Sequence, residues 1–202
     1  SSGMAALELV TRTLAPHGSR IVALRDLYGG SFRFLEVLAE EGAARVDFVL
    51  GVEGLRGALA DPADLVIIET PTNPMMEEIS IPEAAELAHA AGAKLVVDNT
   101  FYTPVVQRPL ELGADVVVHS ATKYLGGHGT AIAGVIVDGG NFDWTQGRHP
   151  NFTTPDPSYH GVVFADLGAP AFALKARVQL LRDLGPAISP FNAFLLSQGI
   201  ET

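Results

Sequence analysis

The sequence predicts an α/β fold built on an open, mostly parallel sheet. Short runs of Val, Ile and Leu alternate along the chain with stretches of helical periodicity, which is typical of parallel strands joined by helices. Several apolar runs are continuous, as expected for strands buried on both faces. Polar side chains also gather just after strands 65–69, 94–98 and 115–119, where ligands bind in such sheets.

The elements follow one another in a regular order. Apolar runs bounded by turn residues predict the strands, and apolar positions at a period near 3.6 predict the helices. Pro82 suits the first turn of the fourth helix, with Ser80 as a nearby cap. The expected strands are 20–24, 46–50, 65–69, 94–98, 115–119 and 132–137. The expected helices are 4–14, 31–41, 53–59, 82–91, 171–184 and 190–197.

The pattern changes between residues 139 and 170. Gly, Pro, Asn, Asp and aromatic residues dominate there, and periodicity is lost. Residues 144–159 are typical of a long surface loop, and loops of that length in compact domains are usually functional or mobile. We therefore expect residues 141–170 to be a loop insertion.

Composition narrows the class of protein. The chain has 202 residues, of which 48% are hydrophobic, and this suits one domain. A net charge of −10 without basic clusters argues against nucleic acid and anionic membranes as partners. No apolar run is long enough for a membrane span and no signal peptide is visible, so a cytoplasmic enzyme is expected. Cysteine is absent and the six histidines are scattered, so no metal site is expected.

Ser120, Thr122 and Lys123 form the first candidate group, directly after strand 115–119. In an extended chain, hydroxyls two residues apart share a face, and beside an ammonium group they make an anion cradle. The amine of a lysine in an apolar pocket is more readily deprotonated and becomes a nucleophile able to form a Schiff base. On its own, this motif would more often be a solvated loop lysine beside two loop hydroxyls.

Asp98 closes the apolar strand 94–98. A carboxylate at such a position is costly unless it is paired, and the protonated nitrogen of a pyridine ring is a suitable partner. A strand-end or helix-capping aspartate bonded to the backbone is an equally good interpretation of this one residue.

Four further residues lie near predicted element ends. Asn73, between prolines, can donate to a phenolate oxygen, although an ordinary Asn-Pro turn is the commoner reading. Tyr28, before a glycine pair, can stack on a planar ring and act as an acid or base, or simply pack at the edge of the core. Gly3 and Met4, at a helix start, can offer backbone N–H groups to a phosphate.

Taken together, these segments resemble the Cys/Met-metabolism enzymes that depend on pyridoxal 5'-phosphate (PLP). The family includes cystathionine synthases and lyases, methionine γ-lyase and O-acetylhomoserine sulfhydrylases, and it has the aspartate-aminotransferase-like (type I) fold. The resemblance implies a three-layer α/β/α large domain. The matching segments are Tyr-Gly-Gly-Ser at 28–31, Glu-Thr-Pro-Thr-Asn-Pro at 69–74, Val-Val-Asp-Asn-Thr-Phe at 96–101 and His-Ser-Ala-Thr-Lys-Tyr-Leu-Gly-Gly-His at 119–128.

The resemblance implies roles around the cofactor ring. Lys123 would hold PLP as a Schiff base and move protons at the substrate carbons. Asp98 would pair with the pyridine nitrogen, Asn73 would hydrogen-bond the ring 3-oxygen, and Tyr28 would stack on the ring and take part in catalysis.

The phosphate site follows from the same resemblance. Ser120, Thr122 and the backbone amides of Gly3 and Met4 would hold the phosphate group. His128, Tyr159 and His160 are not expected to be catalytic.

Two parts of the chain point to different branches of the family. Segments 137–144, 155–161, 174–185 and 189–202 resemble O-acetylhomoserine sulfhydrylases, whereas 69–74 and 101–112 look more like cystathionine synthases and lyases. The long loop weighs more, because an insertion is harder to match by chance. The resemblance then implies γ-replacement on O-acetyl-L-homoserine by sulfide or a thiol, giving homocysteine or methionine plus acetate.

Three alternatives stay open or are disfavoured. Cystathionine γ-synthase or γ-lyase activity is the alternative within the family, and a catalytically incomplete fragment is the alternative outside catalysis. A dinucleotide-binding domain is disfavoured, because no G-x-G-x-x-G follows the first strand.

The resemblance also bears on domains and partners. Residues 1–202 would be the PLP-binding large domain of a longer protein, without an N-terminal segment and a C-terminal small domain. Relatives form homo-oligomers, dimers of dimers, in which a neighbouring subunit contributes Tyr and Arg to the phosphate. They bind the substrate carboxylate through an arginine of the C-terminal domain, a position that Arg108, Arg148, Arg177 and Arg182 do not match.

Overall fold

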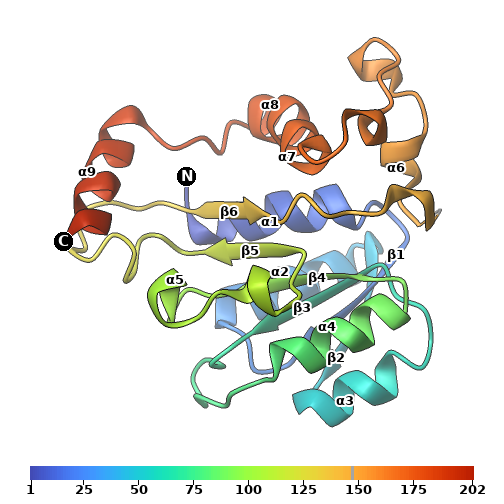
Figure 1. The fold of residues 1–202 in the computed structure, drawn as a ribbon, viewed down its shortest axis with the longest axis horizontal. Helices are drawn as coiled ribbons and strands as arrows, with labels where there is room; N and C mark the ends of the chain where they lie inside the picture. Colours follow the sequence, from blue (N-terminus) through green and yellow to red (C-terminus); the bar gives the residue numbers. More distant parts are fainter. Residues whose placement is uncertain (147) are drawn as a thin grey trace.

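The computed structural model describes residues 1–146 and 148–202 of the chain. Gly147, inside the expected loop insertion, lies outside the described residues. In the described part, six strands form one sheet in the order β2-β1-β3-β4-β5-β6 (Figure 1). The strands are β1 (Ser19–Leu24), β2 (Ala44–Val49), β3 (Leu65–Glu69), β4 (Lys94–Asp98), β5 (Val116–His119) and β6 (Val135–Asp138).

The sheet is mostly parallel, as predicted. The pairings from β2 through β5 are parallel, and only β6 runs antiparallel, beside β5. The prediction of a strand over 132–137 was wrong at its start, since β6 begins at Val135. Ala133 instead donates its N–H to the Thr122 hydroxyl at 3.1 Å and accepts the Thr122 N–H at 3.2 Å, so its backbone groups are used before the ladder begins.

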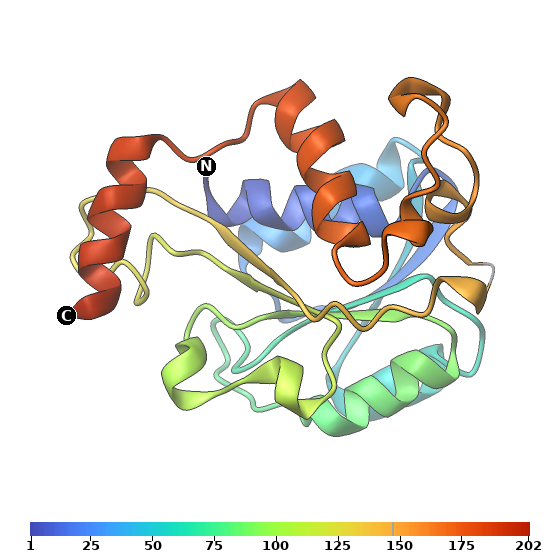
Figure 2. The ribbon, with the colours of Figure 1, turned by 45° about the horizontal axis from the view of Figure 1, so that its top comes forward.

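Helices cover both faces of the sheet, which confirms the three-layer prediction. On one face, α1 (Gly3–Leu14) packs against β5 and β6, α2 (Gly29–Glu40) packs against β2, and α7 (Ala171–Ala176) packs against α1. On the other face, α3 (Gly51–Ala58) and α4 (Ile81–Ala90) contact β1, β2 and β4. Figure 2 shows the blue helices of the first group above the sheet and the green and cyan helices of the second group below it.

Burial on both faces explains the continuous apolar runs. Val22, Val66, Val97 and Val118 are completely inaccessible to solvent in the middle of their strands. Their alternating side chains fill the space under each helical layer, so no position of a central strand is left for a polar residue. Polar residues are accordingly placed where the strands end.

The C-terminal helices lie where they were predicted, with one irregular turn. The helix predicted over 171–184 consists of α7, a π-helical turn, η5 (Arg177–Leu181), and α8 (Arg182–Leu184). α9 (Pro190–Glu201) continues beyond the predicted 190–197, with Ser189 as its N-cap. Figure 1 places α9 at the end of the molecule toward which β5 points.

The loop insertion is not simply a surface loop. It contains short helical segments that the sequence did not predict, and its Trp144 and Phe152 rings stack at 3.9 Å and are buried. The residues anchoring it lie at the amino ends of the strands: Lys94 packs over Phe142, and Arg148 binds Asp64 at 2.8 Å. The short segments outside the sheet and the main helices are α5 (Thr103–Val106), η1 (Pro109–Leu112), η2 (Trp144–Gln146), α6 (Pro150–Thr153), η3 (Pro157–Tyr159) and η4 (Phe164–Leu167).

Candidate active site

A cavity of about 660 Å³ opens at the carboxyl ends of β3, β4 and β5. Its size suits a small cofactor with a substrate. Every site residue predicted from the sequence lines this one cavity, although they are distributed over more than half of the chain. These residues are Gly3, Met4, Tyr28, Asn73, Asp98, Ser120, Thr122 and Lys123.

The N-terminus of α1 forms one wall of the cavity. Ser2 caps the helix by accepting the Ala5 N–H at 3.1 Å, and the first N–H groups of a helix have no partner within it. Gly3 lets this end approach Ser120, because a Cβ there would lie 2.6 Å from the Ser120 Cβ. A helix N-terminus beside a serine hydroxyl is a suitable site for a phosphate.

Residues 120–123 form a turn rather than the extended segment that the hydroxyl spacing suggested. The Lys123 N–H donates to the Ser120 carbonyl at 3.0 Å, and the Thr122 hydroxyl donates to the Ala133 carbonyl at 3.2 Å. Thr122 therefore lines the cavity, but its hydroxyl group is already hydrogen-bonded to Ala133. Lys123 reaches the cavity from the same turn, but its side chain is exposed rather than enclosed in an apolar pocket.

Asp98 combines the two interpretations that the sequence allowed. Its Oδ1 accepts the Thr100 N–H at 3.0 Å and the Thr100 hydroxyl at 2.5 Å, as a strand-end aspartate does. In the described part of the chain no hydrogen bond reaches Oδ2, and the side chain lines the cavity. Burial raises the pKa of Asp98, while the Thr100 bonds lower it. A cation in the cavity would compensate this carboxylate.

A short relay links the ends of β4 and β5. The Ser120 N–H donates to the Thr100 hydroxyl oxygen at 2.8 Å, and that hydroxyl donates to Asp98. The turn that presents Ser120 and Lys123 is therefore tied to the carboxylate on the neighbouring strand. Sequence reasoning missed Thr100, although it lies two residues after Asp98, where a hydroxyl commonly bonds a strand-end aspartate.

Tyr28 and Asn73 enter from the loops after β1 and β3. The Tyr28 ring lies against Gly30, where an added Cβ would be 2.5 Å from the ring Cε1. The side chain is about half exposed, which leaves the ring accessible from the cavity. Asn73 is partly buried, and no hydrogen bond of its side chain is present among the described residues. Both are free to contact a bound ring.

Glu69 is a second carboxyl group in the cavity that sequence reasoning did not select. It is the last residue of β3, pairs in register with Asp98, and is only 4% exposed. Burial and the neighbouring Asp98 raise the pKa of Glu69 to about 8, against one backbone hydrogen bond that lowers it. The signal that marked Asp98, a carboxylate closing an apolar strand, was equally present here.

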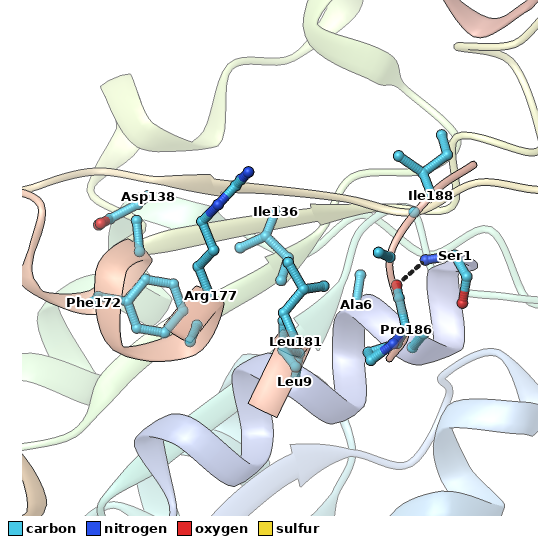
Figure 3. Close-up of a pocket in the computed structure, with 15 residues that line it drawn as sticks. Ser1, Ala6, Leu9, Ile136, Asp138, Phe172, Arg177, Leu181, Pro186 and Ile188 are labelled. Carbon is cyan, nitrogen blue, oxygen red and sulfur yellow. Dashed lines mark hydrogen bonds between the residues drawn. The ribbon is translucent and has the colours of Figure 1, made fainter. Parts of the chain in front are cut away.

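A second cavity, of about 430 Å³, lies between α1, β6 and α7 (Figure 3). Its wall is mostly apolar, with Leu9, Ile136 and Phe172 among the labelled side chains. The Ser1 amino group, which donates to the Pro186 carbonyl at 2.5 Å, lies at one end. None of the predicted site residues lines this cavity, and among the described residues that do line it there is no lysine, so its chemistry differs from that of the first.

The described residues also bear on membrane insertion and on metal binding. None of the helices there combines the length and the apolar character that a bilayer crossing requires. Among the same residues, no three or more His, Asp or Glu side chains are grouped so as to hold a metal ion.

The residues of the first cavity fit PLP. The cofactor needs an anion site for its phosphate, a carboxylate for its ring nitrogen and an amine for its aldehyde. The N-terminus of α1 with Ser120, the free oxygen of Asp98 and the Lys123 amine supply these three groups around one space. The close approach of Gly3 to Ser120 is a cradle that a Cβ would fill.

Curated proteins with related names are similar to this chain along its whole length. The chain is 45% identical to the O-acetyl-L-homoserine sulfhydrylase of Leptospira meyeri and 44% identical to the homocysteine synthase of Schizosaccharomyces pombe. Each match covers 100% of this chain and 48% of the relative. The chain thus spans about half the length of the curated relatives it matches.

Solved structures agree with the fold. A Campylobacter jejuni protein described as an O-acetylhomoserine (thiol)-lyase, with N'-pyridoxyl-lysine-5'-monophosphate in its chain, superposes with a TM-score of 0.94 at 30% identity. The match covers 100% of this chain and 51% of that one. Cystathionine γ-synthase of Xanthomonas oryzae pv. oryzae gives a TM-score of 0.79 at 34% identity over 100% of this chain and 45% of that one.

A family profile matches the whole chain. The profile of the Cys/Met metabolism PLP-dependent enzymes matches residues 1–202. With the fold, the cavity and relatives at up to 45% identity in agreement, this chain belongs to the Cys/Met metabolism PLP-dependent enzyme family, and its cofactor is PLP.

Proposed function

We propose that this chain is the cofactor-binding part of an enzyme that replaces the γ-substituent of O-acetyl-L-homoserine with sulfide or a thiol. The products are homocysteine or methionine, and acetate. The observation that carries the proposal is the single cavity lined by Lys123, Asp98 and the N-terminus of α1. The choice of substrate is supported by the sulfhydrylases and homocysteine synthase that the chain resembles along its whole length.

Lys123 is the proposed catalytic amine. It would hold the cofactor by its aldehyde, and its amine would remove the proton from the substrate Cα. Its position on the turn after β5, at the cavity wall, allows the same amine to reach neighbouring substrate carbons. Tyr28 is the second proposed catalytic residue, as a group that stacks on the ring and takes part in proton transfer.

The remaining residues orient the cofactor. Bound PLP supplies an electron sink that stabilises negative charge at the substrate Cα. Asp98, with one oxygen held by Thr100, keeps the ring nitrogen protonated, which maintains that property. Asn73 donates to the ring 3-oxygen.

The phosphate is held at the other end of the cavity. Ser120 and the Gly3 and Met4 amides are the proposed donors. Thr122 supports the same turn through the hydrogen bonds of its hydroxyl with Ala133.

The test is a substrate comparison with the full-length protein. O-acetyl-L-homoserine is supplied with sulfide, with methanethiol or with cysteine, and the sulfur-containing product is quantified. Homocysteine or methionine as the main product is the expected result. Preference for cysteine with formation of cystathionine would contradict the proposal and support a cystathionine γ-synthase, the candidate that the Xanthomonas structure favours.

The same full-length preparation also tests whether the protein is catalytically incomplete. Protein that binds PLP but forms no product with any of the three nucleophiles would indicate it. The assignment of residues 1–202 as one PLP-binding domain, with 141–170 as an insertion, stays a prediction, as does a cytoplasmic location.

We further propose a homo-oligomer, a dimer of dimers, with active sites shared between subunits. Tyr124 and Ile132 line the cavity, and Met75 and Met76 follow Asn73 in the chain; these four apolar residues are each about 60% exposed. Exposed apolar surface of this kind is typical of an interface. Analytical ultracentrifugation of the full-length protein tests this, and a stable monomer with full activity would contradict it.

A further inference from the structure

Glu69 occupies an unusual place for a charged residue. It ends β3 with its side chain toward the cavity and is almost fully buried. Its register partner on β4 is Asp98, so two carboxyl groups lie side by side at the bottom of one site. Such a pair is costly to bury and needs a structural reason.

The contacts of Glu69 supply that reason. Its Oε2 accepts the backbone N–H of Tyr28 at 2.6 Å, across the sheet from β3 to the start of α2. Tyr28 is the N-cap residue of α2 and makes no side-chain capping bond of its own. The buried carboxyl group of another strand therefore fixes the backbone at this helix start.

That backbone position determines where the Tyr28 ring stands. The ring lies over Gly30, and the Met4 side chain from α1 approaches the same spot. The turn is tight enough that a Cβ on Gly30 would collide with the ring. A small shift of the Tyr28 backbone would move the ring relative to the cavity, since the side chain is about half exposed and makes no hydrogen bond among the described residues.

The neighbouring Asp98 influences the protonation state in which Glu69 accepts the Tyr28 N–H. Burial first, and then the charge of Asp98, raise the pKa of Glu69 to about 8. The group that accepts the Tyr28 N–H at neutral pH is therefore mainly the neutral acid. A neutral amide oxygen can accept the same hydrogen bond, whereas a hydrocarbon side chain cannot.

We infer that Glu69 is a positioning residue for the cofactor site: it holds the backbone of Tyr28 so that the Tyr28 ring faces the PLP ring. This inference rests on the assignment of the cavity to PLP and is independent of which nucleophile the enzyme uses. Glu69 acts through Tyr28 and does not itself contact the reacting atoms.

The experiment compares Glu69→Gln with Glu69→Leu in the full-length protein. The readouts are the dissociation constant of PLP, from titration of the cofactor-free protein, and the visible circular dichroism of bound PLP, which reports ring orientation. Glu69→Gln should stay within about twofold of the parent in affinity, whereas Glu69→Leu should bind about tenfold more weakly, as expected for one lost hydrogen bond. The visible dichroism should change in the Leu variant alone.

Two controls separate positioning from general destabilisation. Asp115 is equally buried, accepts the Leu95 N–H at 2.7 Å and lies at the opposite end of the sheet, so Asp115→Leu is the matched variant. It should lower the melting temperature without changing the visible dichroism. In a Tyr28→Ala background, Glu69→Leu should have little further effect on PLP affinity, because the residue through which it acts is gone.

Several results would overturn the inference. Unchanged dichroism and affinity in Glu69→Leu, equal losses in the Gln and Leu variants, or a full tenfold effect persisting without Tyr28 would each do so. Should Glu69→Leu not fold, Glu69→Val replaces it, and a Gln variant with altered dichroism suffices to reject the inference. A parent protein that binds PLP normally but makes neither homocysteine nor methionine would reject the proposed reaction and leave this test intact.

Discussion

At the scale of single residues, the site depends on polar groups whose capacity for hydrogen bonds and ion pairs is only partly used by the described residues. Asp98 has one oxygen bonded to Thr100 and the other directed to the cavity, and Lys123 stands at the rim without an ion pair among the described residues. A buried carboxylate without a partner is energetically costly, and an amine without a carbonyl partner performs no reaction. Each group acquires a function when a ring nitrogen and an aldehyde occupy the space between them.

Lys123→Ala tests the first of these groups. Because the amine both binds the cofactor and moves protons, activity of the full-length enzyme should fall by at least about 1000-fold. Borohydride treatment of the parent should attach PLP irreversibly to the peptide containing Lys123. The variant, treated in the same way, should release its PLP on denaturation. Retained turnover in the alanine variant would disprove the assignment.

Glu69→Gln tests the charge balance of the cavity in the absence of PLP. The pKa of Glu69 is raised to about 8 in the folded chain, so between the unfolded pKa and this value the folded state keeps a proton that the unfolded state has lost. The free energy of unfolding of the parent should therefore decrease as the pH rises through this window. Glu69→Gln should be more stable than the parent at pH 8, by about 2–4 kcal/mol, and match it near pH 4.

Urea unfolding at pH 4, 6 and 8 is the measurement. The exposed Glu36, on the surface of α2, provides the control, and Glu36→Gln should show no comparable pH dependence. A Glu69→Gln curve parallel to that of the parent at all three pH values would show that Glu69 ionises normally.

At the scale of elements, the site relies on the ends of secondary structure meeting closely. Gly3 allows α1 to start against Ser120, and Glu69 ties the start of α2 to the end of β3. The loop insertion, by contrast, is anchored at the opposite ends of the strands through Lys94 and Asp64. None of the residues described between 141 and 170 lines the site cavity.

Gly3→Ala tests the approach of α1 to the cavity. The new methyl group would lie 2.6 Å from the Ser120 Cβ and 2.9 Å from its Cα, so either the helix or the turn has to move. We expect PLP affinity to fall by about tenfold or more, because the amides and the serine hydroxyl no longer converge. Gly57→Ala, in the last turn of α3 with nothing near its added Cβ, should leave PLP binding unchanged and stabilise the protein slightly.

Asp156→Asn tests how the insertion is held. Hydrogen bonds from Ser158, and then from Lys175 and Gln179, lower the pKa of Asp156 to about 2. Lys175 is buried and lies 4.4 Å from the Phe164 ring centroid, so removing the charge of its partner at 3.1 Å should cost about 3 kcal/mol at pH 7.

The pH dependence follows from the lowered pKa. The contribution of Asp156 is present above its unfolded pKa near 4 and is lost as the pH falls toward 2, so parent and variant should converge in acid. Chemical unfolding at pH 7 and at pH 3 measures this. Asp166→Asn, an exposed aspartate in η4, should have little effect, and an equal loss there would contradict the proposed anchor.

At the scale of the whole molecule, much of the fold and the outline of the site were predictable. Buried parallel strands require continuous apolar runs, and the residues that end them, such as Asp98, must face the same edge of the sheet. The predicted residues met in one cavity because every one of them lies at the corresponding end of an element.

What was not predictable depended on contacts between distant segments. Thr122 bonds to Ala133, which displaced the start of β6, and no local pattern indicates that choice. The burial of Trp144 and Phe152 depends on surfaces of strands and helices far away in the sequence. Glu69 carried the right local signal, but its contact with Tyr28 joins positions 41 residues apart.

The residues that line the cavity are spread along the chain, and this constrains when the site can form during synthesis. Its wall runs from Ser2 to Ile132, and the parallel strands that present it pair only after each crossover helix has been made. Loop closure over such distances is slow compared with local helix formation. A partly synthesised chain ending before Lys123 would carry the phosphate site and Asp98 but lack the amine that binds the cofactor covalently. Covalent attachment of PLP therefore requires a chain synthesised beyond Lys123, and by mass action bound PLP stabilises the folded chain against unfolding.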